Sequence, residues 1–594
     1  MISFLKKHSV AVALLVIFTG VVAAPYLIPA DPDSPVFRSG TFGAFVLAAA
    51  FFPVKTAIKR AGRRILIVGL IWGFLFACAL SIGSELFFYE CLLPGASSML
   101  RRVAVPVLAA PLFGGVASCI MLQCPAGFLY RRRMPVWVFA CVLVVCWFPV
   151  WLAYFPAMIN YDFPGQYAQH LSGVYSMRHP LLYSVLANSI VAFGKRLVSG
   201  SFGLFMLAAL QVGVFSLSLG YACAFAQRHG APPLVLAMLT ALFAFHPIFS
   251  VMAVSMTKDT LFAAMVLLLT LESWSMLEKP QEFFSQRGKR ICFAILCTLV
   301  VLLRNNGVFA IVLLLGGLIF ALRGYRERIL RLTALCVVSP VAVFFMLNLA
   351  LHPQTEGFEL YSLPAQQLVR AYHLGEMSDS DKEELESWYT YKAGLFLTPH
   401  LADRAKGHLK EERLQTQNGA FLELWARNAR GNVRVYTEAF LLLNIGSWYP
   451  DDFSHASIYW EAFFEDRGYL QTQEYDMSQE GFDTICLLPS VRELIERICR
   501  RNEYQKTPFL PILFCTATPF WVLMFSAAVL AVKRRRKMWV GLFGIKGLWL
   551  SYLFGPCTLP RYMLPFFCLA PVALIFAFSI DEGENLKDDM NCLI

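Results

Sequence analysis

Long blocks of apolar residues constrain the fold of this chain more than any other feature. The blocks run for about 18 to 25 residues, without the 3.6-residue or 2-residue periodicity of half-buried helices and strands. A helix of that length crosses a hydrocarbon core of about 30 Å. Only 15% of the 594 residues are charged, against roughly 25% in soluble domains. The sequence therefore predicts an all-α polytopic membrane protein.

Reading along the chain, we expect about 14 spans. They lie near 8–29, 41–54, 65–86, 103–123, 135–155, 201–226, 231–252, 258–277, 291–303, 307–322, 330–351, 509–532, 538–556 and 561–580. The first block resembles a signal peptide, because Lys6 and Lys7 precede it and small residues end it. Further spans follow at once, so we interpret it as a retained anchor.

Basic residues in the short loops predict the orientation. With the N-terminus in the cytoplasm, 24 Lys and Arg fall in cytoplasmic loops and 9 in the opposite short loops, as the positive-inside rule requires. This assignment of the loops to the two sides holds only if residues 181–198 do not cross the membrane. We therefore expect an interfacial helix there on the outer face. Residues 352–508 then lie outside, with 16 basic and 25 acidic residues, and are expected to form a mostly helical soluble domain. The tail 581–594 is expected in the cytoplasm.

The domains expected from this pattern are extra N-terminal spans (1–134), a membrane core (135–351) with an outer loop (156–200), the soluble domain and C-terminal spans (509–580). The net charge of +11 is a topogenic signal in this arrangement, so no nucleic-acid partner is expected. Most of the 16 Cys lie in apolar blocks, where Cys behaves as a small hydrophobe. Cys486 and Cys499 alone are candidates for a disulfide.

Polar residues at the outer ends of the spans are the candidates for chemistry, because ionisable groups near membrane depth are costly. The loop after the fifth span carries Asp162, and His179–Pro180 begins the interfacial helix. A carboxylate there can act as general base on an acceptor hydroxyl. Taken alone, Asp162 is more simply an ordinary loop residue near a turn-forming Pro–Gly.

Four more ionisable residues fall on the same face. Lys258 and Asp259 open a helix, where Asp is also a common helix-terminal residue. Arg304 and Arg561 stand at outer helix ends, where a guanidinium can bind phosphate at about 1.5–3 kcal/mol per charge-assisted bond or simply snorkel. His246 is interpreted as a satisfied helix-end histidine.

Together these motifs resemble the GT-C superfamily of integral-membrane glycosyltransferases. The resemblance rests on the outer-loop Asp, the His–Pro–Leu opening of the interfacial helix, and the segments TKD (257–259), RNNG (304–307) and RYMLP (561–565), and it covers about 135–580. The chain looks closest to bacterial relatives of protein mannosyltransferases and aminoarabinose transferases, and to an uncharacterised bacterial multi-pass family. That family shares segments such as SLPAQQLVRAY (362–372) and GSWYPD (446–451). The first four spans fall outside the resemblance.

The resemblance implies transfer of a sugar from a polyprenyl-phosphate donor to a cell-envelope acceptor on the outer membrane face. Asp162 matches the acidic residue proposed to activate the acceptor, and His179 matches the histidine near the donor phosphate. Lys258, Asp259, Arg304 and Arg561 complete the expected donor site, the two arginines on electrostatic grounds. Asp162 has no acidic neighbour and Arg178 precedes the His–Pro motif, so the resemblance leaves a divalent metal and the donor sugar open.

Two other functions remain as alternatives. A transporter or flippase of a lipid-linked substrate would show broken helices and charges near the bilayer midplane, where Lys546 is the clearest candidate. A scaffold without activity would leave the Asp162 and His179 loop unexplained. The sequence contains no HExxH, CxxC, Walker A or GxGxxG motif for another catalytic class.

Overall fold

The computed structural model is helical throughout the residues that it describes. These are all residues except 1, 28–39, 124–127, 129, 131, 161, 355–357, 451–480, 500, 502, 507–509 and 580–594. Within them, β-type pairing is limited to isolated bridges. The expected all-α class is confirmed.

Eight helices in the described residues are long and apolar enough to cross a membrane, or nine if one bent pair is a single span. The eight are α2 (Ser9–Leu27), α4 (Arg63–Tyr89), α5 (Ala96–Met121), α6 (Val136–Ala153), α9 (Gly200–Arg228), α12 (Lys258–Glu278), α16 (Arg326–Leu351) and α27 (Pro560–Phe578). The bent pair is α10 (Pro233–Phe245) and α11 (Pro247–Val254), with 47° between them. The chain is thus a multi-pass membrane protein.

The predicted count of 14 spans stays a prediction. The other five predicted spans coincide with helices that are not among these candidates, and two of them, Gly307–Ala321 and Thr518–Val532, are shorter apolar helices. They are α3 (Gly40–Arg60), α14 (Arg287–Leu303), α15 (Gly307–Ala321), the pair α24 (Leu510–Phe514) and α25 (Thr518–Val532), and the pair η9 (Arg536–Leu542) and α26 (Phe543–Tyr552).

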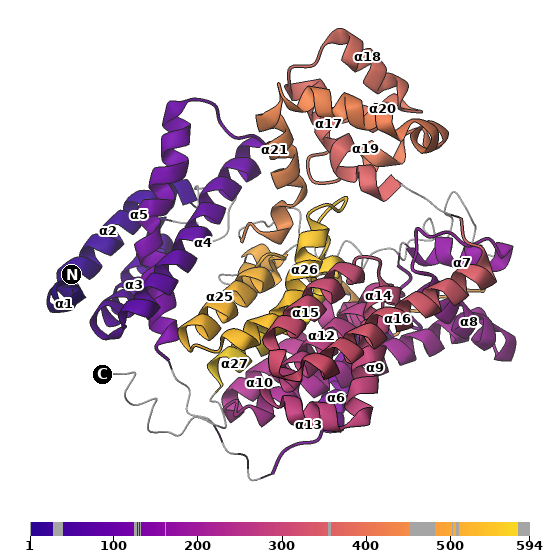
Figure 1. Cartoon of the computed structure of the whole chain (residues 1–594), viewed down its shortest axis with the longest axis horizontal. Helices are drawn as coiled ribbons and strands as arrows, with labels where there is room; N and C mark the ends of the chain where they lie inside the picture. Colours follow the sequence, from indigo (N-terminus) through magenta and orange to yellow (C-terminus); the bar gives the residue numbers. More distant parts are fainter. Residues whose placement is uncertain are drawn as a thin grey trace.

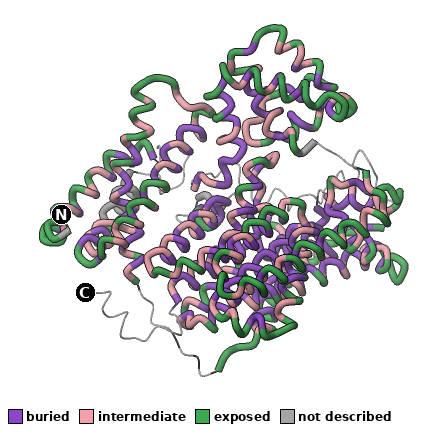
Figure 2. Tube along the Cα trace, in the orientation of Figure 1, coloured by how far each residue is buried: buried purple, intermediate pink, exposed green. Residues whose placement is uncertain are grey.

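Helix α12 is the centre of the membrane core. It packs against α9, α14, α26 and α27, and most of its side chains are buried (Figure 2). Its sequence is apolar on all sides, as expected for a helix enclosed by others. Near its end Trp274 stacks on Phe576 of α27, with 4.4 Å between ring centroids, and donates a hydrogen bond to the Met538 carbonyl. These contacts hold the C-terminal end of α12 in place.

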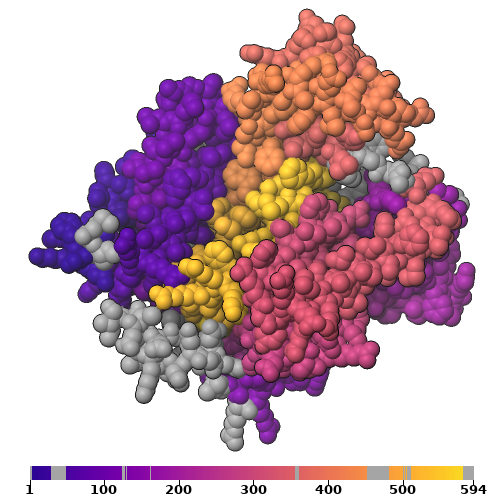
Figure 3. Space-filling model, in the orientation of Figure 1, coloured from indigo at the N-terminus to yellow at the C-terminus, as the bar shows by residue number. Residues whose placement is uncertain are grey.

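The N-terminal helices form a separate group beside this core (Figure 1 and Figure 3). Helices α4 and α5 cross closely at Gly73 and Gly114, where a Cβ on Gly73 would lie 2.4 Å from the Gly114 amide nitrogen. Small residues permit such approaches between membrane helices. Trp72 of α4 packs edge-on against Trp521 and Phe525 of α25, which joins the group to the C-terminal helices.

Residues 361–436 form a compact helical unit, here called the cap (Figure 1). Its helices are α17 (Ser362–Leu374), α18 (Asp379–Ser387), α19 (Asp403–Gly407), α20 (Glu411–Ala429) and the start of α21 (Val433–Leu443). Trp388, Phe421 and Leu424 are fully buried in its core. The cap lies within residues 352–508, and the expectation that this stretch is a soluble domain stays a prediction.

The rest of that stretch packs elsewhere. Ile445 and Tyr449, after α21, pack against the N-terminal helices, and α23 (Pro489–Cys499) packs on α6 of the core. Cys486 and Cys499 are both free thiols, so the candidate disulfide does not form. The tail 581–594 lies outside the described residues.

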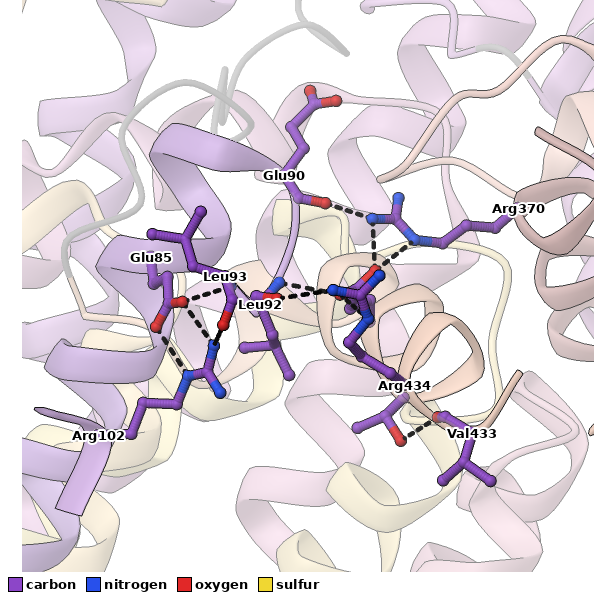
Figure 4. Close-up of polar contacts among 10 residues, drawn as sticks. Glu85, Glu90, Leu92, Leu93, Arg102, Arg370, Val433 and Arg434 are labelled. Carbon is purple, nitrogen blue, oxygen red and sulfur yellow. Dashed lines mark hydrogen bonds and ion pairs between the residues drawn. The ribbon is translucent and has the colours of Figure 1, made fainter. Parts of the chain in front are cut away.

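A buried ion pair fixes the cap to the N-terminal helices (Figure 4). Arg370 of α17 pairs with Glu438 of α21, with Nη2–Oε2 at 3.0 Å, and both side chains are at most 2% exposed. The same Arg370 donates to the carbonyl of Glu90 at the end of α4. Glu438 accepts the Leu92 amide at 2.9 Å and lies 3.7 Å from Arg434. The network therefore spans two parts of the molecule.

A second ion pair stabilises the N-terminal side of this contact. Glu85 of α4 binds Arg102 of α5 through two hydrogen bonds of 2.7 and 2.9 Å. Its carboxylate also accepts the Leu93 amide, while Arg102 donates to the Leu93 carbonyl at 2.6 Å. The turn that receives the cap is thus held by side chains on both of its helices (Figure 4).

The loops gather at two opposite ends of α12. Arg535 pairs with Glu278 at its last residue, so the basic cluster 533–537 lies at that end. At the first residues of α12 lie the candidate site and a contact with the cap, where the Ala402 amide donates to the Pro556 carbonyl at 2.8 Å. Helix α8 (Leu181–Leu197) covers the predicted interfacial segment and packs on α9. Its placement at the membrane surface stays a prediction.

Candidate functional site

Five of the six predicted site residues meet in one cluster of ion pairs. Asp162 begins α7 (Asp162–Ser172), and its Oδ2 lies 2.6 Å from Lys258 Nζ and 3.4 Å from Arg561 Nη1. Asp259 pairs with Arg304 and lies 3.7 Å from Arg561 Nε. Arg561 thus joins the two carboxylates, and segments far apart in sequence form one site.

Backbone contacts between loops hold Asp162 near the start of α12. Met158, four residues before Asp162, accepts the Met256 amide at 2.8 Å and donates to the Val254 carbonyl at 3.0 Å. Thr257 then caps α12, because its side-chain oxygen accepts the Asp259 amide at 3.3 Å. The loop after α6 and the break between α11 and α12 are therefore fixed side by side.

The charged side chains of the site are enclosed. Arg304 and Arg561 are 11% and 9% exposed, and Asp259 is fully buried. Arg304 also stacks over Tyr562 at 4.1 Å and Tyr552 at 5.2 Å from the ring centroids. Neither arginine reaches out to solvent, so the snorkelling interpretation is wrong for both. Asp259 does more than stand at the start of a helix, because its carboxylate also binds two guanidinium groups.

His179 lies close enough to the cluster for its charges to affect the pKa of the imidazole. Burial, together with nearby cations, lowers the pKa of His179 to about 3 against the opposing charge of Asp162. The imidazole is therefore neutral at pH 7 and can donate or accept a hydrogen bond without adding charge. No hydrogen bond from it to the ion pairs is described, so His179 adjoins the cluster and is not joined to it.

The Asp162 carboxyl is strongly held in its ionised form. Burial raises its pKa, but the positive charges of Arg561 and Lys258 outweigh burial and hold the pKa well below its ordinary value. Three cations and two carboxylates leave one positive charge in excess inside a nearly closed site. Such a site attracts an anionic ligand. The ligand would compete with the two carboxylates for the cations.

The described residues contain no group of three or more His, Cys, Asp and Glu that could hold a metal ion. Asp162 and Asp259 each bind cationic side chains instead. The question of a divalent metal, left open by the sequence, stays open.

Several residues of the site were missed from the sequence. Asn160 accepts Arg561 Nη1 at 3.1 Å, while Tyr552 and Tyr562 stack on Arg304. Asn160 and Tyr562 stand within two residues of Asp162 and Arg561, so proximity in sequence was the available signal. Among the other polar residues, His246 is a satisfied helix-end histidine as predicted: its Nε2 lies 3.0 Å from the Leu513 carbonyl and its Nδ1 accepts the Ile248 amide.

The sequence matches one described family over residues 170–589, the family of unknown function DUF6020. The chain belongs to the DUF6020 family. The DUF6020 match includes His179, Lys258, Asp259, Arg304 and Arg561 and begins after Asp162. No curated protein and no solved structure matches the chain.

Proposed function

We propose that this DUF6020 protein is a GT-C-type glycosyltransferase that uses a polyprenyl-phosphate sugar. The observation that carries the proposal is the enclosed cluster in which Asp162 pairs with Lys258 and shares Arg561 with a second carboxylate, Asp259. A lipid-linked donor needs cations for its phosphate and a base for the acceptor hydroxyl within one site. The cluster supplies both kinds of group at helix ends, where the lipid chain can stay in the bilayer.

The ion pairs suggest an order of events. A carboxylate with a depressed pKa is a weak base while its cations are in place. When the donor phosphate binds, Lys258 and Arg561 are drawn toward it and Asp162 loses part of its neutralising charge. The basicity of the Asp162 carboxylate then rises, so that it can accept the proton of an acceptor hydroxyl. Neutral His179 is available to hydrogen-bond the phosphate or the sugar.

The proposed site faces outward, beneath the cap, with a cell-envelope acceptor such as a protein, a teichoic-type polymer or a glycolipid. A cysteine at exposed Ser378 of the cap should therefore react with an impermeant thiol reagent on intact cells. A cysteine at exposed Ser285, at the opposite end of the core, should react only after the cells are opened. Labelling is scored against the wild-type chain with its native thiols, and the reverse pattern would place the site in the cytoplasm.

Donor binding should depend on the two arginines. Arg304→Ala or Arg561→Ala is expected to weaken binding of a polyprenyl-phosphate sugar by about 10- to 100-fold, the effect of one or more charge-assisted bonds. Lys at either position keeps the charge but lacks the planar fork, so it should restore binding only in part. Titration of purified protein with the lipid measures this. Unchanged affinity in both Ala variants would remove the arginines from the donor site.

A flippase of lipid-linked sugars is the second candidate, favoured by the 47° bend between α10 and α11, because broken helices are typical of transporters. Purified protein in liposomes, supplied with a labelled polyprenyl-phosphate sugar and candidate acceptors, separates the two functions. Formation of glycosylated acceptor supports the transferase. Movement of the labelled lipid between leaflets without product, for every acceptor tried, would replace it with the flippase.

A further inference from the structure

Next to Asp162 lies a group of buried, uncharged polar side chains. Asn160, Gln166, Ser184 and Asn188 are each at most 1% exposed. Five of their polar atoms find no hydrogen-bond partner within the described part of the chain: Asn160 Nδ2, Gln166 Nε2 and Oε1, Ser184 Oγ and Asn188 Oδ1. Buried polar groups are nearly always hydrogen-bonded in proteins, so this concentration around one carboxylate calls for a ligand.

The four side chains belong to two adjacent helices and the loop before them. Gln166 follows Asp162 by one turn on α7, and Ser184 and Asn188 stand one turn apart on one face of α8. Asn188 Nδ2 donates to the Gln166 carbonyl at 2.8 Å, which places that face of α8 against α7 (Figure 1). Asn160 uses its carbonyl oxygen for Arg561. The unpartnered atoms therefore belong to segments that contact one another and the ion pairs.

A neighbouring set of polar groups shows that this part of the fold can satisfy its own hydrogen bonds. Tyr183, also on α8, donates to Gln211 at 3.1 Å, and Gln211 donates to the Ser255 carbonyl at 2.6 Å. That chain of bonds leads toward Lys258 and is complete. On α8, the unpartnered atoms among the described side chains are thus those of Ser184 and Asn188.

The chemistry of these atoms selects a ligand class. Amide nitrogens donate, amide oxygens accept, and the serine hydroxyl does both, while none of the four side chains carries charge. A sugar hydroxyl also donates and accepts, whereas a lipid tail does neither and a phosphate is served better by the adjacent cations. The arrangement matches a neutral ligand with several hydroxyl groups.

We infer that Asn160, Gln166, Ser184 and Asn188 form a subsite that binds the hydroxyl groups of a sugar beside Asp162. The inference rests on the proposed function and adds to it the residues that select the sugar. Because the four side chains are closed off, α7 and α8 separate slightly when the sugar enters, as active-site segments do on substrate binding. The sugar is that of the donor lipid or of a glycosylated acceptor, and the test distinguishes them.

The test compares binding of a bare lipid phosphate with binding of its glycosylated form. Purified wild type, Gln166→Met and Ser184→Ala are titrated with undecaprenyl phosphate alone and with undecaprenyl phosphate carrying glucose, mannose, galactose or 4-amino-4-deoxyarabinose. A third titration uses bare undecaprenyl phosphate plus the methyl glycoside of each sugar. In the wild type, one sugar should tighten binding. Each variant should lose about 2- to 10-fold of that sugar-dependent gain, the effect of one hydrogen bond, and keep its affinity for the bare lipid.

Stability gives a second readout that separates a ligand site from a structural one. Both substitutions remove unpartnered polar groups at nearly constant volume, so the ligand-free thermal stability should stay equal or rise. Thr333→Val is the matched control, because the Thr333 hydroxyl on α16 is also buried without a described partner but lies outside the site. It should leave every lipid affinity unchanged.

The outcomes are distinct. A gain seen with the lipid-linked sugar assigns the subsite to the donor, and a gain seen only with a methyl glycoside assigns it to the acceptor. If the wild type shows a sugar-dependent gain that both variants retain in full, the side chains hold only water, and the subsite is overturned while the transferase stands. If no sugar in either form changes binding by the wild type, both the subsite and the proposed function fail.

Discussion

Asp162→Asn is expected to reduce sugar transfer by about 10²- to 10⁴-fold, the usual cost of removing a general base. The amide is nearly isosteric and can still accept a hydrogen bond from Lys258, which lies 2.6 Å from the carboxylate. It cannot take up the acceptor proton. Because Lys258 and Arg561 lose a competing negative charge, affinity for the donor phosphate should stay equal or rise. Transfer rate, donor affinity and thermal stability are measured on the same purified protein.

Asp259→Asn is the matched control for this result. It removes the same charge from the same cluster, at a carboxylate that binds Arg304 and Arg561 but not Lys258. If Asp162 acts as base, its variant should lose far more activity than the Asp259 variant at comparable stability. Equal losses would mean that the cluster needs only its charge balance. A stable Asp162→Asn protein with near wild-type transfer would remove Asp162 from catalysis.

Arg370→Ala is expected to destabilise the protein by about 3–5 kcal/mol, the typical cost of leaving one charge of a buried ion pair without its partner. Glu438 would keep only the Leu92 amide and the more distant Arg434. Thermal unfolding in detergent measures the loss. The double variant Arg370→Met, Glu438→Leu should recover much of it, because no unpaired charge stays buried.

Arg427→Ala tests whether any ion pair in the cap has this effect. Arg427 pairs with Asp381 but is 41% exposed, and exposed pairs contribute little to stability. Its loss should barely move the unfolding temperature. If Arg370→Ala behaves like Arg427→Ala, the buried network does not hold the cap in place.

The sequence was sufficient for the fold class and for the expectation that the site residues gather at one end of the helices. The lengths of the apolar blocks predict membrane helices, and Asp162, Lys258, Arg304 and Arg561 all stand at helix ends that the basic loops assign to one side. Their convergence was therefore predictable. Their pairing was not, because the contacts of Arg561 with both carboxylates depend on how α7, α12 and α27 pack.

Other features left weaker signals. Glu85 is an acidic residue inside the apolar block 65–86, where a carboxylate needs a cationic partner. Only the packing of α4 against α5 identifies that partner as Arg102. Ser184 and Asn188 have the spacing of one helix face, but the sequence does not show what covers that face of the predicted interfacial helix. The structure buries them against α7. Short spans such as α15 and α26 were expected from hydropathy, while their true membrane depth depends on neighbouring helices.

The contact between the cap and the α4–α5 turn also bears on how the protein is made. The carbonyl of Glu90 and the amide of Leu92 bind residues that lie 280 and 346 positions further along the chain. During synthesis the N-terminal helices therefore leave the ribosome long before the cap does, because domains are made in chain order. The cap therefore folds after the α4–α5 turn to which it binds has been synthesised. A transplanted cap would carry Arg370 without the Glu90 carbonyl that it binds, so the N-terminal helices act as an assembly template for the cap.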